Sequence, residues 1–298
     1  MEQKKSKINP KTLGIIYIII SAFSFACMSL FVNLSGDMPV FQKAFFRNCV
    51  AIILSVGLLL RSKEKFKVKK GSLKYLVLRA SFGTLGILFN FYAISHINLA
   101  DAQILNKLSP FFAILASIFI LKEVANKRQW LSVIVAFIGA LFVVKPTGLS
   151  NPEHLFPSLI GLSGGLVAGI AYTFMRKLSL KGERSEVIVA FFSIFSCVVL
   201  IPFVIATYEP ISTKQLICLI LAGCCACSGQ IFITSAYARC PAKEISIYDY
   251  SSVIFAAILG FFVLDQKPDI FSFCGYAIII LASLYSYIHN VKKQPQQQ

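Results

Sequence analysis

Ten apolar blocks, each of about 20 residues, constrain the fold of this chain more than any other feature. An α-helix rises 1.5 Å per residue, so a block of this length crosses a hydrocarbon core about 30 Å thick. Open strands cannot exist in lipid, because no water is present to satisfy their backbone groups. We therefore predict an all-α integral membrane protein with ten transmembrane helices. They cover about 12–33, 40–60, 75–95, 101–121, 129–145, 158–176, 187–206, 215–237, 245–264 and 270–288.

The composition excludes a water-soluble domain. Of the 298 residues 57% are hydrophobic and 14% are charged, whereas a soluble domain of this length carries about 25% charged residues. The formal net charge of +16 does not indicate a nucleic-acid partner, because the basic residues lie at the ends of the apolar blocks and form no continuous stripe. The partner that this composition predicts is a lipid bilayer.

The distribution of Lys and Arg predicts the orientation. If the N-terminus lies inside the cell, the inner segments carry 22 basic residues and the outer segments carry 3. Basic residues beside membrane spans accumulate on the cytoplasmic side. We therefore expect a multi-pass protein of the cell membrane with both termini in the cytoplasm.

The two halves of the chain contain a similar motif, an apolar run that ends in an acidic residue. The first copy extends from Ser109 to Glu123 and the second from Ser251 to Asp265. Five spans in each half is an odd number, so the second half must enter the membrane upside down relative to the first. Inverted repeats of this kind are typical of secondary transporters. The expected organisation is a cytoplasmic tail at 1–11, a first five-helix repeat at 12–145, an external connecting loop at 146–157, a second five-helix repeat at 158–288, and a cytoplasmic tail at 289–298.

No motif in the chain indicates an enzyme, a cofactor or a metal. Cys224, Cys225 and Cys227 resemble a metal-binding cluster, but they lie in an apolar helix without a nearby His, and we interpret them as packing residues. A phosphate-binding Gly loop, an HExxH motif and a nucleophile with a matching base are all missing. By contrast, Gly161, Gly165 and Gly169 follow i, i+4 spacing and predict a face for close helix packing.

Four basic residues lie within spans of the first half, where a charge costs about 2.5–3.5 kcal/mol on insertion scales. Arg79 and Lys43 are one turn from a membrane surface, so the simpler interpretation is that both side chains extend to that surface. Arg47 and Lys107 lie deeper, and for these two we favour a position facing a cavity. Lys43 shares a helix face with Arg47 and is kept as a candidate binding residue.

Asp249 is the one carboxylate clearly inside a span, next to Tyr248. An ion pair with a basic residue on another helix and a contact with substrate are both reasonable interpretations. The two are compatible, since a pair that substrate opens is one way to gate a transporter. Asp249 could also carry a coupling proton, and exchange without an ion agrees equally well with the sequence.

Several uncharged polar residues complete the candidate site. Interhelical hydrogen bonding is the ordinary role of such residues. Asn106 is of special interest because it adjoins Lys107, and Pro110 should kink the same span and free backbone carbonyls toward a wet cavity. The candidate substrate-binding residues are thus Lys107, Arg47, Asp249, Asn106, Lys43, Tyr248, Asn90, Tyr172 and Gln230.

At this level of detail the chain resembles a known family, the drug/metabolite transporter superfamily in its ten-span EamA-type branch. The resemblance rests on Phe45-Phe46-Arg47, Phe91-Tyr92-Ala93, Leu99-Ala100-Asp101-Ala102, Leu108-Ser109-Pro110, Lys122-Glu123, Tyr237-Ala238, Pro241-Ala242 and Leu264-Asp265. It covers about residues 12–288. The resemblance implies two inverted five-helix repeats around a central cavity lined by the fourth and ninth spans. It also implies movement of amino acids, sugars, organic acids or other metabolites by alternating access.

The leading functional hypothesis is a secondary transporter for a small polar metabolite. Three or four basic residues against one embedded acid favour an anionic or zwitterionic substrate, such as an organic anion or an amino acid. The alternative is a membrane scaffold or lipid-binding protein, whose basic segment Arg61–Lys74 would contact anionic head groups. The sequence does not predict the oligomeric state.

The repeat also predicts where the polar residues meet. Aligning the terminal acids Glu123 and Asp265 gives an offset of 142 and places Lys107 on Asp249. Aligning the best apolar matches gives 143 and places Asn106 there instead. In both alignments the polar break of the fourth span is equivalent to that of the ninth.

Overall fold

A computed structural model describes residues 10–60, 66–122, 127–144, 152–237 and 246–292, and helices are the regular elements of these segments. The first half contains α1 (Pro10–Leu34), α2 (Val40–Leu60), α3 (Leu73–His96), α4 (Leu99–Asn106), α5 (Ser109–Ile120) and α6 (Lys127–Val144). The second half contains α7 (Pro152–Leu180), α8 (Ser185–Ala206), α9 (Thr213–Tyr237), the 3₁₀ helix η1 (Ser246–Tyr250), α11 (Ser251–Leu264) and α12 (Ile270–Lys292).

These elements make up the ten predicted spans, and the all-α prediction is confirmed. Eight stretches of the described residues have the length and hydropathy to cross a membrane, with α4 and α5 together forming one of them. Two shorter apolar stretches, Tyr248–Leu264 and Ile270–Tyr285, supply the ninth and tenth spans. Most boundaries agree with expectation to within four residues. The largest difference is that α7 begins at Pro152, so part of the expected loop 146–157 is helical. Proline is well suited to a first helical turn, because its missing N–H has no helical partner there.

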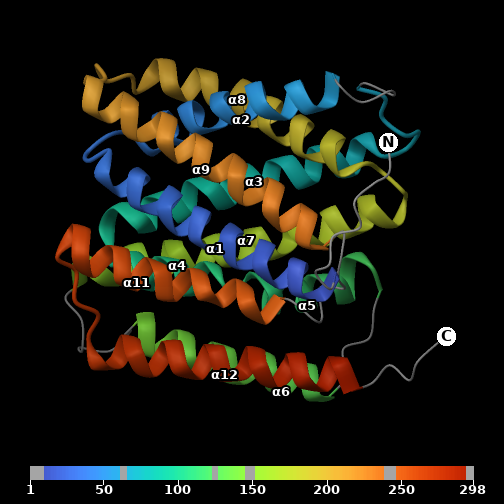
Figure 1. The fold of residues 1–298 in the computed structure, drawn as a ribbon, viewed down its shortest axis with the longest axis vertical. Helices are drawn as coiled ribbons and strands as arrows, with labels where there is room; N and C mark the ends of the chain where they lie inside the picture. Colours follow the sequence, from blue (N-terminus) through green and yellow to red (C-terminus); the bar gives the residue numbers. More distant parts are fainter. Residues whose placement is uncertain (1–9, 61–65, 123–126, 145–151, 238–245, 293–298) are drawn as a thin grey trace.

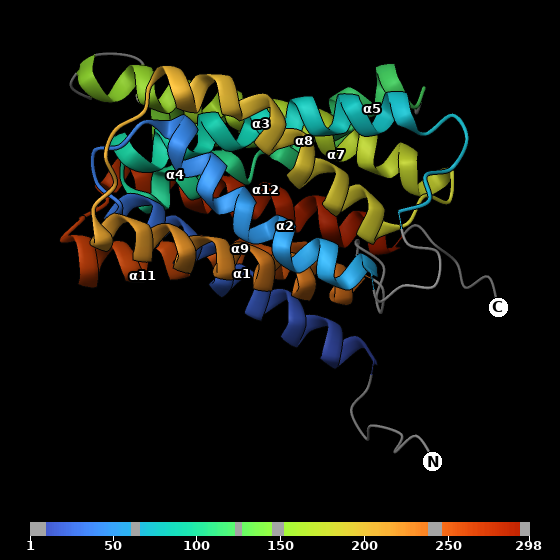
Figure 2. The ribbon, with the colours of Figure 1, turned by 90° about the horizontal axis from the view of Figure 1, so that it is seen from above.

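Helices of the two halves interleave in the bundle. The edge pairs join equivalent helices, since α2 packs against α8 at one edge and α6 packs against α12 at the other (Figure 1). In the centre the partners are exchanged, since α3 packs on α7 and α1 packs on α9. Figure 2 shows the bundle from above, with α1, α9 and α11 on one side and α3, α5 and α7 on the other.

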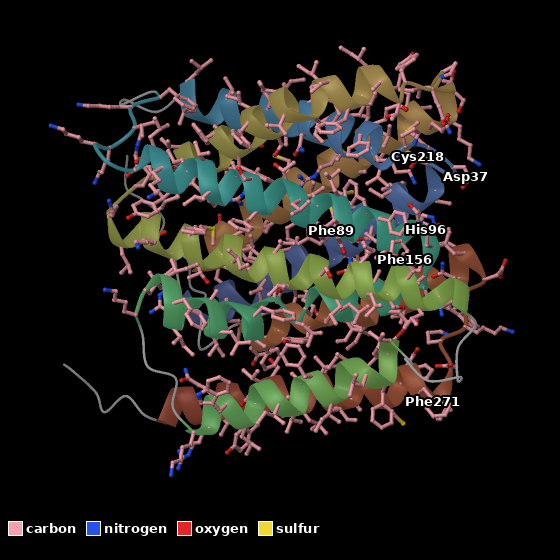
Figure 3. All side chains as sticks on the ribbon, turned by 180° about the vertical axis from the view of Figure 1, so that it is seen from behind. Asp37, Phe89, His96, Phe156, Cys218 and Phe271 are labelled. Carbon is pink, nitrogen blue, oxygen red and sulfur yellow. The ribbon has the colours of Figure 1, made fainter. Side chains whose placement is uncertain are left out.

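The two ends of the bundle differ in charge. The start of α1 and the end of α12 lie at the same end (Figure 1). Side chains tipped with nitrogen extend mostly beyond that end (Figure 3). It carries Lys67, Lys69, Lys70, Lys74, Lys122, Lys127, Arg128, Arg176, Lys177, Lys181 and Arg184, whereas Lys214 and Lys267 lie at the other end. The asymmetry expected from the sequence is therefore present in three dimensions. The expected tails at 1–11 and 289–298 lie largely outside the described residues. Residues 146–151 of the expected connecting loop lie wholly outside them.

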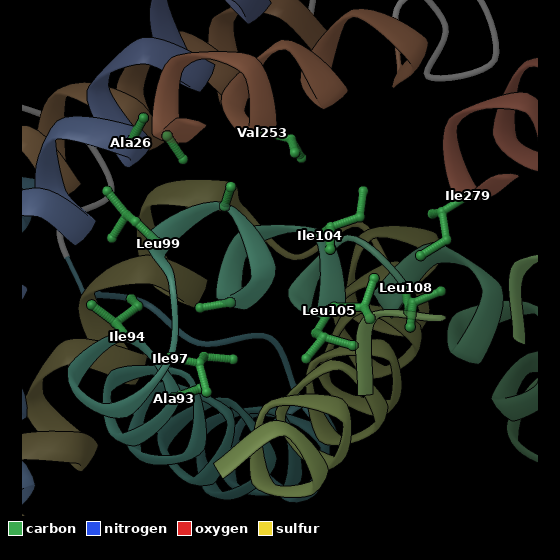
Figure 4. Packing of buried hydrophobic residues seen from close by; sticks show 14 of the residues in the cluster. Ala26, Ala93, Ile94, Ile97, Leu99, Ile104, Leu105, Leu108, Val253 and Ile279 are labelled. Carbon is green, nitrogen blue, oxygen red and sulfur yellow. The ribbon is translucent and has the colours of Figure 1, made fainter. Parts of the chain in front are cut away.

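The core is centred on α4, which is buried on nearly every face. Leu99, Ile104 and Leu105 have no accessible surface, and they pack among residues from several spans (Figure 4). Phe119 and Phe262, in contrast, are 82% and 76% exposed. Apolar side chains this accessible would be a liability in water, and in a bilayer they contact lipid.

The glycine face predicted on α7 is confirmed. A Cβ atom at Gly165 would lie 2.6 Å from the carbonyl oxygen of Leu105, and one at Gly169 would lie 2.7 Å from that of Ser109. At Gly161 the nearest atom would be the Cβ of Ala93 at 3.1 Å. These contacts let α7 approach the backbone of α4 and α5 on both sides of their junction, which fixes the position of that junction.

A pair of alanine substitutions tests this packing. Gly169→Ala should lower the free energy of unfolding by about 1–3 kcal/mol, because backbone atoms of α5 must move away from the added methyl group. Gly57→Ala is the matched control, since nothing lies within 4 Å of its Cβ position and alanine favours helix. Thermal melting in detergent should place Gly169→Ala below and Gly57→Ala at or above the wild-type temperature. Equal melting temperatures for the two variants would contradict the proposed close packing.

Candidate functional site

Two helix breaks face one another across the bundle. In the fourth span α4 ends at Asn106 and α5 begins at Ser109. The kink predicted from Pro110 is present, and its location has a physical reason: a proline ring clashes with the carbonyl four residues earlier, which here belongs to Asn106. In the ninth span the 3₁₀ helix η1 changes to α11 at Ser251. The helices α5 and α11 thus begin 142 positions apart, at Ser109 and Ser251.

An ion pair joins these breaks. Lys107 Nζ lies 2.5 Å from Asp249 Oδ2, and the Tyr250 hydroxyl donates a hydrogen bond of 3.0 Å to the Lys107 carbonyl oxygen. That carbonyl belongs to the helix break, so Tyr250 supplies the partner that the interrupted helix lacks. The predicted ion pair of Asp249 with a base on another helix is confirmed, in the register given by the 142-residue offset.

The pair is neither fully buried nor fully satisfied. The side chains of Lys107 and Asp249 retain 13% and 18% of their accessible surface. Asp249 Oδ1 and the nearby Ser251 hydroxyl are buried, and neither has a hydrogen-bond partner in the segments that the structure describes. A buried polar atom without a partner costs about 1–3 kcal/mol, so such atoms tend to mark positions where a ligand or water completes the network.

Tyr172 of α7 is within electrostatic reach of charged groups from both repeats. Its side chain is 45% exposed, and the charges of Asp249 and Arg79 both act on it.

Arg47 and Arg79 both point inward. Arg47 is 6% exposed, and its Nη1 donates a 2.9 Å hydrogen bond to Asn48 Oδ1. Arg79 is 8% exposed, and its guanidinium carbon lies 3.9 Å from the centroid of the Phe192 ring. The expectation that Arg79 extends to the membrane surface is wrong. The sequence contained a signal for this, because Gly83 lies four residues later and its missing Cβ would stand 2.7 Å from Arg79 Nη1.

Lys43 is also turned inward, so the expectation that it reaches the surface is wrong as well. It is 1% exposed and donates a 2.8 Å hydrogen bond to Ser95 Oγ near the end of α3. The charge of Asp37 acts on it. Within the described residues Lys43 is thus held by its own polar neighbours, and no contact joins it to the Lys107–Asp249 pair.

The remaining candidates come from several elements. Asn106 is the last residue of α4 and is half-buried, Asn90 is buried in α3, Gln230 is half-buried in α9, and Tyr248 in η1 is 38% exposed. Their roles stay predictions. Across the parts of the chain that the structure describes, no group of three or more His, Cys, Asp or Glu residues is placed to hold a metal ion.

Comparison with known proteins agrees with this architecture. The model of the EamA-like transporter family matches residues 12–145 and again residues 155–288. The pseudopaline exporter CntI of Pseudomonas aeruginosa is 29% identical over 273 residues, which cover 91% of this chain and 94% of the exporter. A riboflavin transporter of Brucella anthropi is 27% identical, covering 81% of this chain and 86% of its own length.

Two further similarities extend over most of the chain. Solute carrier family 35 member G1 of Mus musculus is 26% identical, covering 94% of this chain and 80% of the mouse protein. A protein of known crystal structure superposes with a TM-score of 0.66 at 12% identity, covering 96% of this chain and all of its own. This last likeness concerns the fold alone.

Paired and single substitutions test the energetics of the ion pair. Asp249→Asn and Lys107→Met should each lower the free energy of unfolding by up to about 3 kcal/mol, because each leaves one charge without its partner. The double variant Lys107→Met/Asp249→Asn should recover most of the loss, since no unpaired charge remains. Thermal melting of all four proteins in detergent measures the coupling. Additive losses in the double variant would show that the two side chains do not interact.

Proposed function

The chain belongs to the EamA-like transporter family, and on that premise we propose that it is a secondary transporter that moves a small polar metabolite across the cell membrane by alternating access. The substrate is an amino acid or an organic anion. The observation that carries this proposal is the Lys107–Asp249 ion pair, which joins the broken span of one repeat to the broken span of the other.

The position of the pair suits a gate. Lys107 adjoins α5, in the layer of α3, α5 and α7, and Asp249 lies in η1, which packs on α1 and α11 of the other layer (Figure 2). Any movement of one layer against the other therefore acts on the contact. Its partial exposure leaves it open to competition by a charged solute. A substrate that offers a carboxylate to Lys107 or an amine to Asp249 replaces the internal contact with its own, and the two layers are then free to separate at this point.

The charges of the site are the best guide to the substrate. The relatives named above carry the names of two different small molecules, pseudopaline and riboflavin, and so give no single substrate to transfer. A zwitterion can use both Lys107 and Asp249, whereas a dianion would use basic residues alone. Asp249 Oδ1 has no hydrogen-bond partner within the described part of the chain, and it is the atom at which a substrate amine or a coupling proton would be held.

One end of the bundle is closed by contacts between the repeats. The backbone N–H of Leu99, at the start of α4, donates a 2.8 Å hydrogen bond to Gln266 Oε1, which follows α11. A Cβ atom at Gly260 would lie 3.6 Å from the Cβ of Leu99. We infer that α4 and α11 separate at this end when the transporter changes state, and that the basic opposite end faces the cytoplasm.

Transport assays test the role of the pair. Purified protein is first screened by thermal shift against amino acids, organic acids, sugar phosphates and nucleotides, because a ligand of the folded state raises the melting temperature. Compounds that bind are then followed into proteoliposomes with and without an imposed pH gradient. Asp249→Asn should reduce transport of a zwitterion more than that of a dianion, and Lys107→Ala should reduce both. The exposed Lys181→Ala serves as the control with unchanged transport.

Two outcomes would count against this reading. If Lys107→Ala transports every compound as the wild type does, the ion pair has no part in transport. If the wild-type protein moves no solute and yet binds anionic lipid specifically, the chain is a lipid-binding or scaffold protein.

A cross-link tests alternating access directly. The variant Leu99→Cys/Gly260→Cys places two thiols at a Cβ separation compatible with a disulfide. Oxidation should hold α4 against α11 and stop transport, and a reductant should restore it. The single variants Leu99→Cys and Gly260→Cys, treated in the same way, are the controls. Full transport by the cross-linked protein would falsify the proposed separation of these helices.

A further inference from the structure

We propose that Arg47 and Arg79, together with Asn48, form an oxyanion-binding subsite that is distinct from the Lys107–Asp249 pair and receives a carboxylate of the transported molecule. The inference rests on the proposed function and deepens it by naming the substrate class. Its elements are α2, which provides Arg47 and Asn48, and α3, which provides Arg79.

The first argument is the number of donors that lack an acceptor. Nε of Arg47, Nε and Nη1 of Arg79, and Nδ2 of Asn48 are all buried, and none has a hydrogen-bond partner among the residues that the structure describes. Native proteins leave few buried polar atoms unsatisfied, and an orphaned donor on a charged group is the most costly kind. Four such atoms on three residues form a set of hydrogen-bond donors with nothing to bind.

The second argument concerns charge. The charge of Arg47 acts on Arg79, and the side chains of both residues are more than nine-tenths buried. Among the described residues, the ion pair that the structure shows in the membrane interior is that of Lys107 with Asp249, and no carboxylate is paired with either arginine. Two buried cations without a partner are costly, and an anion that reaches them lowers this cost. A substrate carboxylate would provide that anion.

The third argument is that other contacts hold the Arg47 and Arg79 side chains in place, while several of their N–H donors stay unused. Arg79 stacks on Phe192 and passes over Gly83, and Arg47 is fixed through Nη1 by Asn48. A planar guanidinium fork that is already oriented binds a carboxylate through two parallel hydrogen bonds at little entropic cost. Contacts of this kind preorganise a binding site.

The fourth argument separates this subsite from the ion pair. The charge of Lys107 is already neutralised by Asp249, which leaves the arginines as the free cationic groups of the site. The side chain of Tyr172 is within electrostatic reach of both Arg79 and Asp249 and has a large exposed surface. A molecule beside Tyr172 can therefore place a carboxylate at the arginines and an amine at Asp249, which is the charge pattern of an amino acid.

Binding measurements with matched ligands test the subsite. The probes are amino acids and dicarboxylates, each paired with its amide, and glycerol 3-phosphate as a phosphate source. We expect carboxylates to raise the wild-type melting temperature and their amides not to do so. Arg47→Gln and Arg79→Gln should each weaken the response at least tenfold in ligand concentration, and Arg→Lys at either position should weaken it less. Lys181→Gln, outside the bundle interior, is the matched control and should respond as the wild type does.

The same variants without ligand give a second measurement. Removing an unpaired buried charge should leave the melting temperature of Arg47→Gln and Arg79→Gln at or above that of the wild type. A clear loss of stability in both would show that the guanidinium groups are structural, and would overturn the subsite.

The remaining outcomes are equally decisive. Responses to carboxylates that persist in both Gln variants, or a wild type that responds to no carboxylate, would overturn the subsite, and a response to phosphate alone would overturn the carboxylate assignment. None of these outcomes touches the proposed function if proteoliposomes still show transport. A wild type that transports nothing would refute the proposed function itself.

Discussion

The structure depends on one constraint, that every backbone N–H and C=O group inside a bilayer must find its partner within the protein. Continuous helices satisfy it without help, and most of the described spans are continuous. The exceptions are the fourth and ninth spans, where α4 gives way to α5 and η1 to α11. At the first break the Tyr250 hydroxyl from the opposite repeat binds the Lys107 carbonyl. The break in one repeat is thus made tolerable by the other, and the glycine face of α7 allows the close approach that holds it in place.

The polar interior has two parts that differ in how well they are satisfied. Lys107 and Asp249 neutralise one another, and Lys43 is held by Ser95. Arg47 and Arg79 are oriented by neighbours that use few of their donors. A protein selected for stability alone would replace such groups with apolar side chains, because burying an unpaired charge is costly. Their presence in an otherwise well-packed bundle is what a binding site for a charged solute requires.

Span positions could be predicted from the sequence, since hydropathy reports burial in lipid. The repeat offset of 142 placed Lys107 and Asp249 at equivalent positions, and an ion pair of Asp249 with a base on another helix was one of two interpretations. The sequence did not specify which base that was. The inward direction of the Arg79 and Lys43 side chains could not be predicted from the sequence. Their distance from the span ends is readable from the chain, but the direction in which each side chain points depends on partners far away in sequence, Phe192 for Arg79 and Ser95 for Lys43. Gly83 was a local clue to the first. The start of α7 at Pro152 was missed because the first turn of this helix is polar, and the apolar pattern that marks a span begins only after it.

The exchange of partners between the two halves has a consequence for how the protein is made. The first helix of each repeat packs against the third helix of the other, so neither repeat contains its own complete interface. During synthesis α1 and α3 enter the membrane well before α9 and α7 exist. Until the second half is inserted, the inward faces of α1 and α3, which include Arg79, must contact lipid or the insertion machinery. The repeats are therefore units of sequence but not of folding, and the chain reaches its stable form only when its last spans have been inserted.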